Sequence, residues 1–394
     1  MKKVYLDNAS TTPILPAVRE GMLPYLGELY GNPSCMHDWG DAAREGIENA
    51  REKVAGLIDV DSEELIFTSG GTESNNFAVK GLAMAQQSKG KHVIVSAVEH
   101  FSVLNSAKTL EKWGYEVTTV PVDRYGIVDP DQVRKSIRKD TTLVSIIHGS
   151  SEVGSIQPIR EIARITREKN VVFHTDAVAT VGTIPVSAKE LGVDALSLSG
   201  NQFYGPKGSG ALWVRKGVRI IPFLDGGVQE GGRRAGTENV PAIVGMGIAA
   251  ASAKASMDER KAKLTALRDR LLDTLPAKIE RMIVTGDRKN RLPGHASFCV
   301  EFIEGEAMIM LLSSQGVAVT SGSACTSRAL KASHVLIAMG LTHAVAQGSI
   351  LLSIGIDNNE EEMDYVIEVL PPIVDRLRQM SPLYAKFVKK TKGV

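Results

Sequence analysis

The run VVFHTD at residues 171–176 is apolar along most of its length and ends on a carboxylate, Asp176. Other short runs of this β-forming kind lie along the first half of the chain, at residues 65–67, 92–96, 142–148, 195–198 and 211–214. Polar segments with helical periodicity separate them, such as DPDQVRKSIR at 129–138 and PIREIARITREKN at 158–170. This alternation predicts an α/β fold in which helices cover a mostly parallel sheet.

The last third of the chain has a different pattern. A long helical segment opens near residue 258 and places Leu264, Leu267 and Leu271 on one face, and shorter mixed segments follow it. We therefore expect a domain boundary near residue 258.

Composition excludes several classes of protein. The 394 residues are 43% hydrophobic without a long apolar run, so the chain can bury a large core but shows no membrane span. Lys and Arg number 46 and Asp and Glu 45, so no net field attracts nucleic acid or an anionic membrane. A small substrate or a protein partner is favoured.

In the N-terminal run MKKVYLDNAS, the stretch between the lysines and Asp7 is too short for the apolar segment of a signal peptide, which predicts a cytoplasmic location.

Three segments carry side chains suited to cofactor chemistry. In FTSGGTESNN, small residues precede a helix start, where free amides favour a phosphate, although an ordinary strand-to-helix turn has the same pattern. Asp176 follows a strand at the edge where open α/β sheets bind ligands, and a carboxylate there can keep a pyridine nitrogen protonated. His100 also ends a strand, where it could stack on a planar cofactor, move protons or serve a structural role.

Three cysteines at residues 35, 299 and 325 argue against a disulfide framework. Cys325 lies among small polar residues in VTSGSACTSRAL, a composition that predicts an exposed, mobile loop. Arg328 and Lys331 are close in sequence and favour the thiolate, which attacks sulfur or binds metal. Cys299 lies in the strand-like ASFCVEF and is predicted to be structural, whereas Cys35 receives no role.

With these residues the sequence resembles the cysteine desulfurases of iron–sulfur cluster assembly, the NifS/IscS-like proteins among the class V aminotransferases. The resemblance runs nearly end to end through YLDNASTTP, FTSGGTESNN, VEHFSV, HTDAV, SLSGNQFYGPKG, RRAGTENV, SGSACTS and SHVLIAMGL. It implies the fold-type I architecture of pyridoxal-phosphate-dependent transferases, with a large, mostly parallel seven-stranded sheet domain at residues 14–257. A smaller α+β domain at 258–394, completed by 1–13, is implied to carry the Cys325 loop.

The resemblance also implies a homodimer, L-cysteine as substrate, an iron–sulfur scaffold protein as partner, and pyridoxal phosphate as cofactor. Position by position, it implies a cofactor site made of Gly71, Thr72, His100, Ser151, Asp176, Ala179, Ser199, Asn201, Gln202 and Thr237. Gly71, Thr72 and Ser199 match phosphate contacts, and Thr237 matches a residue that reaches the phosphate from the neighbouring subunit. Cys325 matches the catalytic cysteine that receives sulfur as a persulfide.

The chain departs from the family where the chemistry should occur. The family has His-Lys at Asn201 and Gln202, and that lysine forms the Schiff base, which a carboxamide cannot form. Lys207 is no replacement, because the family carries the YGPKG lysine in addition. Ser151 and Ala179 stand where the family has ring-contacting asparagine and glutamine.

A second loss concerns the substrate. Leu351 and Ile356 replace arginines, of which the first is expected to clamp the carboxylate of the substrate. Leaving that carboxylate unpaired costs about 2 to 5 kcal/mol by analogy with broken buried pairs.

These departures lead to one hypothesis and two alternatives. We expect a desulfurase-family dimer that docks on a scaffold protein and offers Cys325 as a persulfide carrier or as the thiolate ligand of a shared 2Fe-2S cluster. Its own desulfurase activity is expected to be lost, and pyridoxal phosphate to be bound noncovalently or not at all. The first alternative is an active pyridoxal-phosphate cysteine desulfurase that uses another base. The second is an interaction protein in which neither cofactor nor Cys325 matters.

The replacements at positions 202 and 351 predict the effect of restoring the lysine alone. Gln202→Lys alone should not restore full desulfurase activity, because Leu351 still fails to hold the substrate carboxylate. Alanine release from cysteine by Gln202→Lys and by Gln202→Lys/Leu351→Arg measures this. Substantial turnover by the single variant would show that an arginine at position 351 is not needed to hold the substrate carboxylate.

Overall fold

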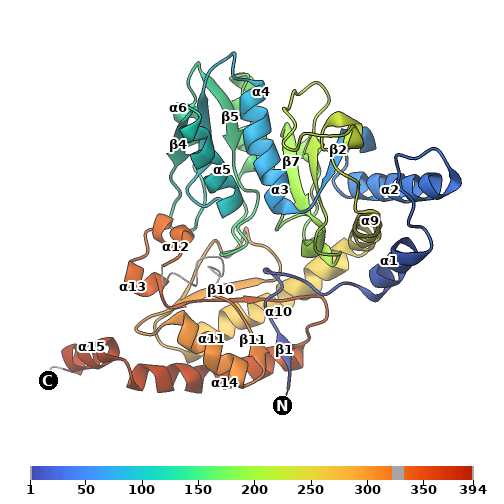
Figure 1. Cartoon of the computed structure of the whole chain (residues 1–394). Coiled ribbons are helices and arrows are strands. Elements are labelled where there is room, and N and C mark those ends of the chain that lie inside the picture. The colour runs from blue at the N-terminus through green and yellow to red at the C-terminus, as the bar shows by residue number, and fades with distance from the viewer. Residues whose placement is uncertain (1, 322–331, 393–394) are drawn as a thin grey trace.

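The computed structural model describes residues 2–321 and 332–392 and contains a large sheet and a small one, each covered by helices (Figure 1). The large sheet has seven strands in the order β2-β8-β7-β6-β5-β3-β4. The strands are β2 (Leu65–Thr68), β3 (His92–Ser96), β4 (Glu116–Val120), β5 (Thr141–Ser145), β6 (Val172–Asp176), β7 (Ala195–Ser199) and β8 (Gly210–Val214). Strand β8 is antiparallel to β2 and β7, and the other neighbours are parallel. The predicted mostly parallel sheet is confirmed.

Alternation along each strand explains why both faces of this sheet are covered. In β3, Ile94 joins one buried cluster while Val93 and Val95 join another, as expected where successive side chains point to opposite faces. Of the seven strands of the large sheet, only the edge strand β4 was not predicted from the sequence. Its residues are mostly half-buried or exposed, so it lacks the apolar run of a central strand.

Helices on the two faces come from different parts of the chain. One face packs against α2 (Asp38–Leu57), α7 (Ile159–Glu168), α8 (Ala188–Leu191) and α9 (Val240–Ala255). The other packs against the continuous helical stretch α3 (Gly71–Asn76), η2 (Phe77–Gly81) and α4 (Leu82–Ala85), and against α5 (Phe101–Lys112). The remaining elements are α1 (Pro16–Gly27), α6 (Pro130–Ser136) and the short turns η1 (Ser62–Glu64), η3 (Gly200–Phe203) and η4 (Gln229–Gly232).

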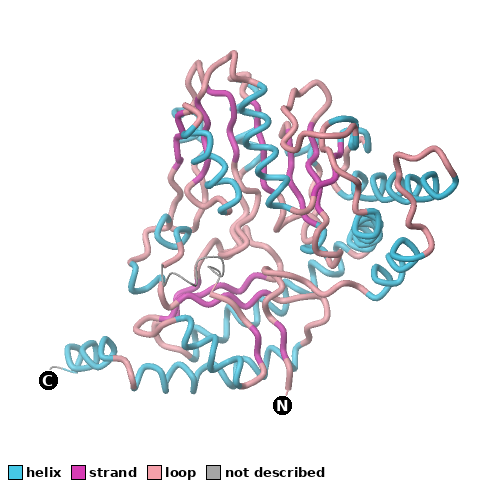
Figure 2. The backbone as a smooth tube through the Cα atoms, viewed as in Figure 1, coloured by secondary structure: helices cyan, strands magenta, loops and turns pink. Residues whose placement is uncertain are grey.

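The small sheet has its own core. Its antiparallel strands lie in the order β12 (Ser349–Ser353), β10 (His295–Val300), β9 (Met282–Val284), and the parallel pair β1 (Val4–Tyr5) and β11 (Val317–Ala318) lies nearby (Figure 2). The helices of this part are α10 (Met257–Lys278), α11 (Gly305–Ser314), α12 (His334–Ala338), α13 (His343–Ala346), α14 (Glu360–Gln379) and α15 (Pro382–Lys392). The predicted apolar face of α10 is confirmed, because Leu264, Leu267 and Leu271 are buried in this core.

The two cores meet where the chain bends. Helices α9 and α10 follow one another at an angle of 75°, and α9 packs in the core of the large sheet while α10 packs in that of the small one. Val4 and Leu6 join the small core although they begin the chain. Domain limits at 14–257 and 258–394 remain our proposal.

Within the described residues, no single helix is both long and apolar enough to cross a membrane, and α9 with α10 meets that criterion only as a bent pair.

A loop that leads into α9 is held by a buried ion pair. The carboxylate of Glu230 accepts hydrogen bonds from Arg51 Nη1 and Nη2, both at 2.8 Å, and from the backbone N–H of Phe67 at 2.8 Å. Glu230 has a left-handed backbone (φ +49°), followed by Gly231 and Gly232, which tolerate that conformation at low cost. The ion pair therefore holds a strained turn against β2.

Removing the cation of this pair should destabilise the fold. In Arg51→Met the Glu230 carboxylate stays buried without its partner, and the free energy of unfolding should fall by about 3 to 5 kcal/mol. Urea unfolding measures the change. As a matched control, Arg160→Met breaks an ion pair with Glu190 whose side chains are both mostly exposed, and should change stability little. Equal effects in the two variants would contradict the argument.

Candidate active site

A cavity of about 440 Å³ lies between the carboxyl ends of the large-sheet strands and the small sheet. It brings together residues that the sequence predicts as a site, namely Gly71, Thr72, His100, Ser151, Asp176, Ala179, Ser199, Asn201 and Gln202. Thr320, Val335 and Leu351 contribute the small-sheet side of the wall. The size suits a small organic molecule.

Asp176 ends β6 at the centre of this cavity wall. Its carboxylate accepts hydrogen bonds from Asn75 Nδ2 at 2.7 Å and from the N–H of Val178 at 3.0 Å. Burial raises the pKa of Asp176, while the nearby His100 opposes that rise. Asn75 was missed by sequence reasoning, because an asparagine inside a short helix gives no signal of which carboxylate it faces.

The turn before α3 is shaped by two glycines. Gly70 has φ +145°, a conformation that other residues rarely adopt, and a Cβ on Gly71 would lie 2.6 Å from Val178 Cγ2. Opposite this turn, His100 caps α5, since its Nδ1 accepts from the N–H of Ser102 at 3.1 Å. The same Nδ1 lies 2.7 Å from Ser102 Oγ. The histidine thus has a structural role as well as a position in the cavity wall.

The two residues that replace the family His-Lys pair make specific hydrogen bonds. Gln202 Nε2 donates to the carbonyl oxygen of Ala9 at 3.1 Å, and Ser199 Oγ donates to Asn201 Oδ1 at 2.6 Å. Thr12 Oγ1 donates to the Asn201 carbonyl at 2.7 Å. The amide at position 202 therefore holds the N-terminal segment against the large sheet.

Two glutamates that sequence reasoning did not select also line the cavity. Glu99 is fully buried, and its Oε1 accepts from Ser96 Oγ at 2.5 Å and from the N–H of Ile147 at 2.8 Å, while its Oε2 has no hydrogen-bond partner. Burial, with a smaller contribution from Asp176, raises the pKa of Glu99 to about 8. Burial raises the pKa of Glu152 to about 7, against a hydrogen bond with Ser333. One signal was available: Glu99 lies three residues after the end of β3, at the same edge of the sheet as Asp176 at the end of β6.

Of the predicted site residues that the structure describes, only Thr237 is not brought to this cavity. Cys325 lies outside the described residues, but Thr320 and His334, on either side of its segment, both line the cavity. Thr237 is exposed on the loop before α9 and is not part of the wall. Cys299 is buried in β10 as predicted, and burial raises its thiol pKa to about 12. Cys35 is partly buried.

The described residues fit only part of a pyridoxal phosphate molecule. Asp176 and His100 suit the pyridine ring, and Gly71 allows close approach of the backbone. Among the described residues that line the cavity, however, none is Lys or Arg, so neither an imine-forming amine nor a cation for the phosphate is present. The Ser199 hydroxyl is already bonded to Asn201. The described residues do not fit a covalently held cofactor.

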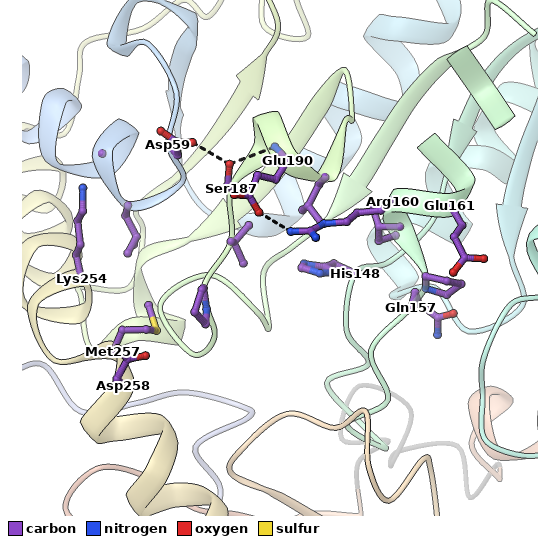
Figure 3. Close-up of a pocket in the computed structure, with 17 residues that line it drawn as sticks. Asp59, His148, Gln157, Arg160, Glu161, Ser187, Glu190, Lys254, Met257 and Asp258 are labelled. Atoms are coloured by element: carbon purple, nitrogen blue, oxygen red, sulfur yellow. Dashed lines mark hydrogen bonds and ion pairs between the residues drawn. The ribbon is translucent and has the colours of Figure 1, made fainter. Parts of the chain in front are cut away.

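A larger cavity, of about 800 Å³, lies elsewhere and holds none of the predicted residues (Figure 3). His148 lines it beside Arg160 at the start of α7, and burial lowers the pKa of His148 to about 4. Two of the carboxylates that line it have partners within it: Glu190 binds Arg160 Nη2 at 2.5 Å, and Asp59 accepts from Ser187 Oγ at 2.9 Å. Because the predicted site residues gather in the first cavity and none lines this one, the first cavity is the candidate active site.

Comparisons with known proteins show what the whole chain is similar to. The profile of the Aminotransferase class-V family matches residues 4–366. The chain is 49% identical to the cysteine desulfurase IscS of Dictyoglomus turgidum over 97% of both chains, and 48% identical to cysteine desulfurase IscS 1 of Archaeoglobus fulgidus over 97% of this chain and 100% of that one. A solved NifS-like protein superposes with a TM-score of 0.89 at 38% identity, covering 95% of this chain and 100% of that one.

The buried acid of Glu99 predicts a pH dependence of stability. Its pKa in the folded protein lies above that of an unfolded glutamate, so the folded state binds the proton more tightly. Its contribution is therefore fully present in acid and is lost as the pH rises towards about 8. Unfolding free energies measured across this range should fall less steeply in Glu99→Gln than in the wild type. The exposed Glu161→Gln serves as control, and a slope unchanged by Glu99→Gln would refute the assignment.

Proposed function

The chain belongs to the aminotransferase class-V family, and from that premise we propose that it is a cysteine desulfurase-like protein of iron–sulfur cluster assembly whose own desulfurase activity is lost. It docks on a scaffold protein and offers Cys325 as a persulfide carrier or as a cluster ligand. The observation that carries the proposal is the side chain at position 202, an amide that is hydrogen-bonded to Ala9 in the cavity wall.

Two features of the wall support the loss of activity. An amide has no nucleophilic amine, so Gln202 can neither bind an aldehyde covalently nor move a proton at the substrate's α-carbon. Leu351, which is 1% exposed in the small-sheet side of the wall, offers no hydrogen bond to a carboxylate. Ile356 does not line the cavity, and its backbone N–H donates to Tyr204 Oη at 2.8 Å. L-cysteine is therefore a poor ligand of this cavity.

The role of Cys325 rests on its chemistry and on the position of the neighbouring residues. Thr320 and His334 bring both sides of its segment to the cavity. The thiolate of Cys325 can attack the outer sulfur of a donor persulfide, so that a new S–S bond forms on Cys325 and the donor leaves as a thiolate. The same thiolate is a soft ligand suited to a 2Fe-2S cluster whose other ligands come from the scaffold.

The alternative of a working pyridoxal-phosphate desulfurase is favoured by the similarity to proteins named cysteine desulfurase and by one feature of the cavity. Asp176 is buried at the end of β6, where it could hold a pyridine nitrogen protonated. A visible absorption spectrum of the purified protein separates the two proposals. A cofactor band that shifts on adding cysteine, with release of alanine, would establish the alternative.

A homodimer in the cytoplasm is the proposed assembly. The support is the exposed Thr237, carried on a loop that the Arg51–Glu230 ion pair holds in place, which leaves it available to a second copy. Neither the net charge nor the described helices suggest a nucleic acid or a membrane as partner.

Cluster assembly in the presence of a scaffold tests the role of Cys325. We expect the wild-type protein, mixed with scaffold protein, iron and sulfide, to speed cluster formation, and Cys325→Ala to lose that effect, because the thiolate is removed. Supplying sulfur as a small-molecule persulfide instead of sulfide separates the carrier role from the ligand role.

Cys35→Ala is the matched control and should behave as the wild type does, since sequence and structure assign Cys35 no role. Equal cluster formation by wild type and Cys325→Ala with either sulfur source would reject the proposal and favour a pure interaction protein.

A further inference from the structure

The larger cavity, of about 800 Å³, is lined by a buried histidine that the candidate active site does not use. His148 lies three residues after β5 and is 5% exposed, and Figure 3 shows it in the wall beside Arg160. Its Nδ1 lies 2.9 Å from Thr180 Oγ1, whereas its Nε2 has no hydrogen-bond partner within the described part of the chain. A ligand in the cavity can supply that partner.

The hydrogen bonds of Thr180 decide which nitrogen of His148 carries the proton. Thr180 Oγ1 donates its single proton to the carbonyl oxygen of Ala177 at 3.0 Å, so it accepts from the N–H at His148 Nδ1. Burial, with a smaller contribution from the nearby Arg160, lowers the pKa of His148 to about 4, so the ring is neutral near neutral pH. Nε2 therefore carries a lone pair and no proton. It is an acceptor, and the ligand that binds it must have an N–H or O–H group.

The start of α7 gives the same wall groups that attract an anion. Pro158 precedes the helix and makes no side-chain cap, and the backbone N–H of Arg160 has no partner among the described residues. A free N–H at the positive end of the helix dipole is a favourable position for a negative charge. The guanidinium of Arg160 contacts Glu190 only through Nη2, so most of its N–H groups can still donate to a ligand. Lys254 adds a second cation to the lining.

The lining also contains carboxylates, namely those of Asp59, Glu161, Glu190 and Asp258. All of these residues are exposed, so water and salt weaken their repulsion of an anion. The charge of Glu190 is offset by Arg160, and Asp59 accepts from Ser187 Oγ. His148, by contrast, is buried, so the acceptor that selects the ligand is protected from water.

From this combination of donors and one buried acceptor, we propose that the cavity binds inorganic hydrogen phosphate at the start of α7. The negative oxygens of the ion accept from the side chain and the backbone N–H of Arg160, and its O–H group donates to His148 Nε2. Sulfate has a similar shape and charge but no proton, so it leaves the buried acceptor unpaired, which is costly. This is a second site, and it does not depend on the function proposed for Cys325.

Three anions of similar size test the proposal. Isothermal titration calorimetry of the full-length protein at about pH 8 compares inorganic phosphate, sulfate and methyl phosphate, because methyl phosphate is then a dianion without an O–H group. We expect inorganic phosphate to bind at least about tenfold more tightly than each of the others, since only its O–H group satisfies His148. Equal or tighter binding of sulfate or methyl phosphate, or no binding of inorganic phosphate at millimolar concentrations, would overturn the proposal.

Substitutions identify the groups responsible. Arg160→Met breaks only a mostly exposed ion pair, so the variant is expected to fold and to bind phosphate about tenfold or more weakly. Arg164→Met, on the same helix but outside the lining, is the matched control and should leave the affinity unchanged. His148→Phe keeps a ring without the acceptor, so phosphate should lose its advantage over sulfate.

An affinity for phosphate that is the same in Arg160→Met as in the wild type, or that falls equally in Arg164→Met, would contradict the proposal. A preference for phosphate over sulfate that persists in a folded His148→Phe variant would do so as well. The wild-type comparison of the three anions needs no variant, so the test stands even where His148→Phe fails to fold.

Discussion

The hydrogen bond from Gln202 Nε2 to the Ala9 carbonyl joins the two parts of the molecule on which the cavity depends. Beyond Ala9, the N-terminal segment reaches the small sheet, since the backbone N–H of Ala9 donates to Ser353 Oγ at 2.9 Å. Thr12 ties the same segment to Asn201. Gln202, at the position where the resemblance implies the Schiff-base lysine, thus serves as a contact between the large sheet and the segment that links it to β12.

This use of Gln202 changes what the cavity can do. A lysine in that position would add a positive charge and a nucleophile to a wall that contains three buried acidic side chains. With an amide there, burial dominates their electrostatics and the protonated forms of Glu99 and Glu152 are favoured. The proposed loss of catalysis therefore follows from this replacement.

The fold class could be predicted from the sequence because most strands of the large sheet are recognisable from a few consecutive residues. Each central strand is a short apolar run, and a parallel sheet with helices on both faces is the arrangement that buries such runs. Strand β4 was not predicted because an edge strand needs no continuous run of apolar residues. Among site residues, Asp176 at the end of β6 and His100 in the loop after β3 could be selected, since the carboxyl ends of parallel strands meet at one edge. Asn75 and Glu152 could not, because their importance depends on neighbours distant in sequence.

The sequence by itself determined the α/β class, the family, the missing amine at position 202 and the missing cation at Leu351, because these are properties of residue identity and order. Only the tertiary structure decided that Glu99 and Glu152 are buried in the same cavity as Asp176, and that their oxygens lack donors. The physical reason is that desolvation and hydrogen-bond satisfaction depend on what surrounds a side chain in space, which chain order does not specify.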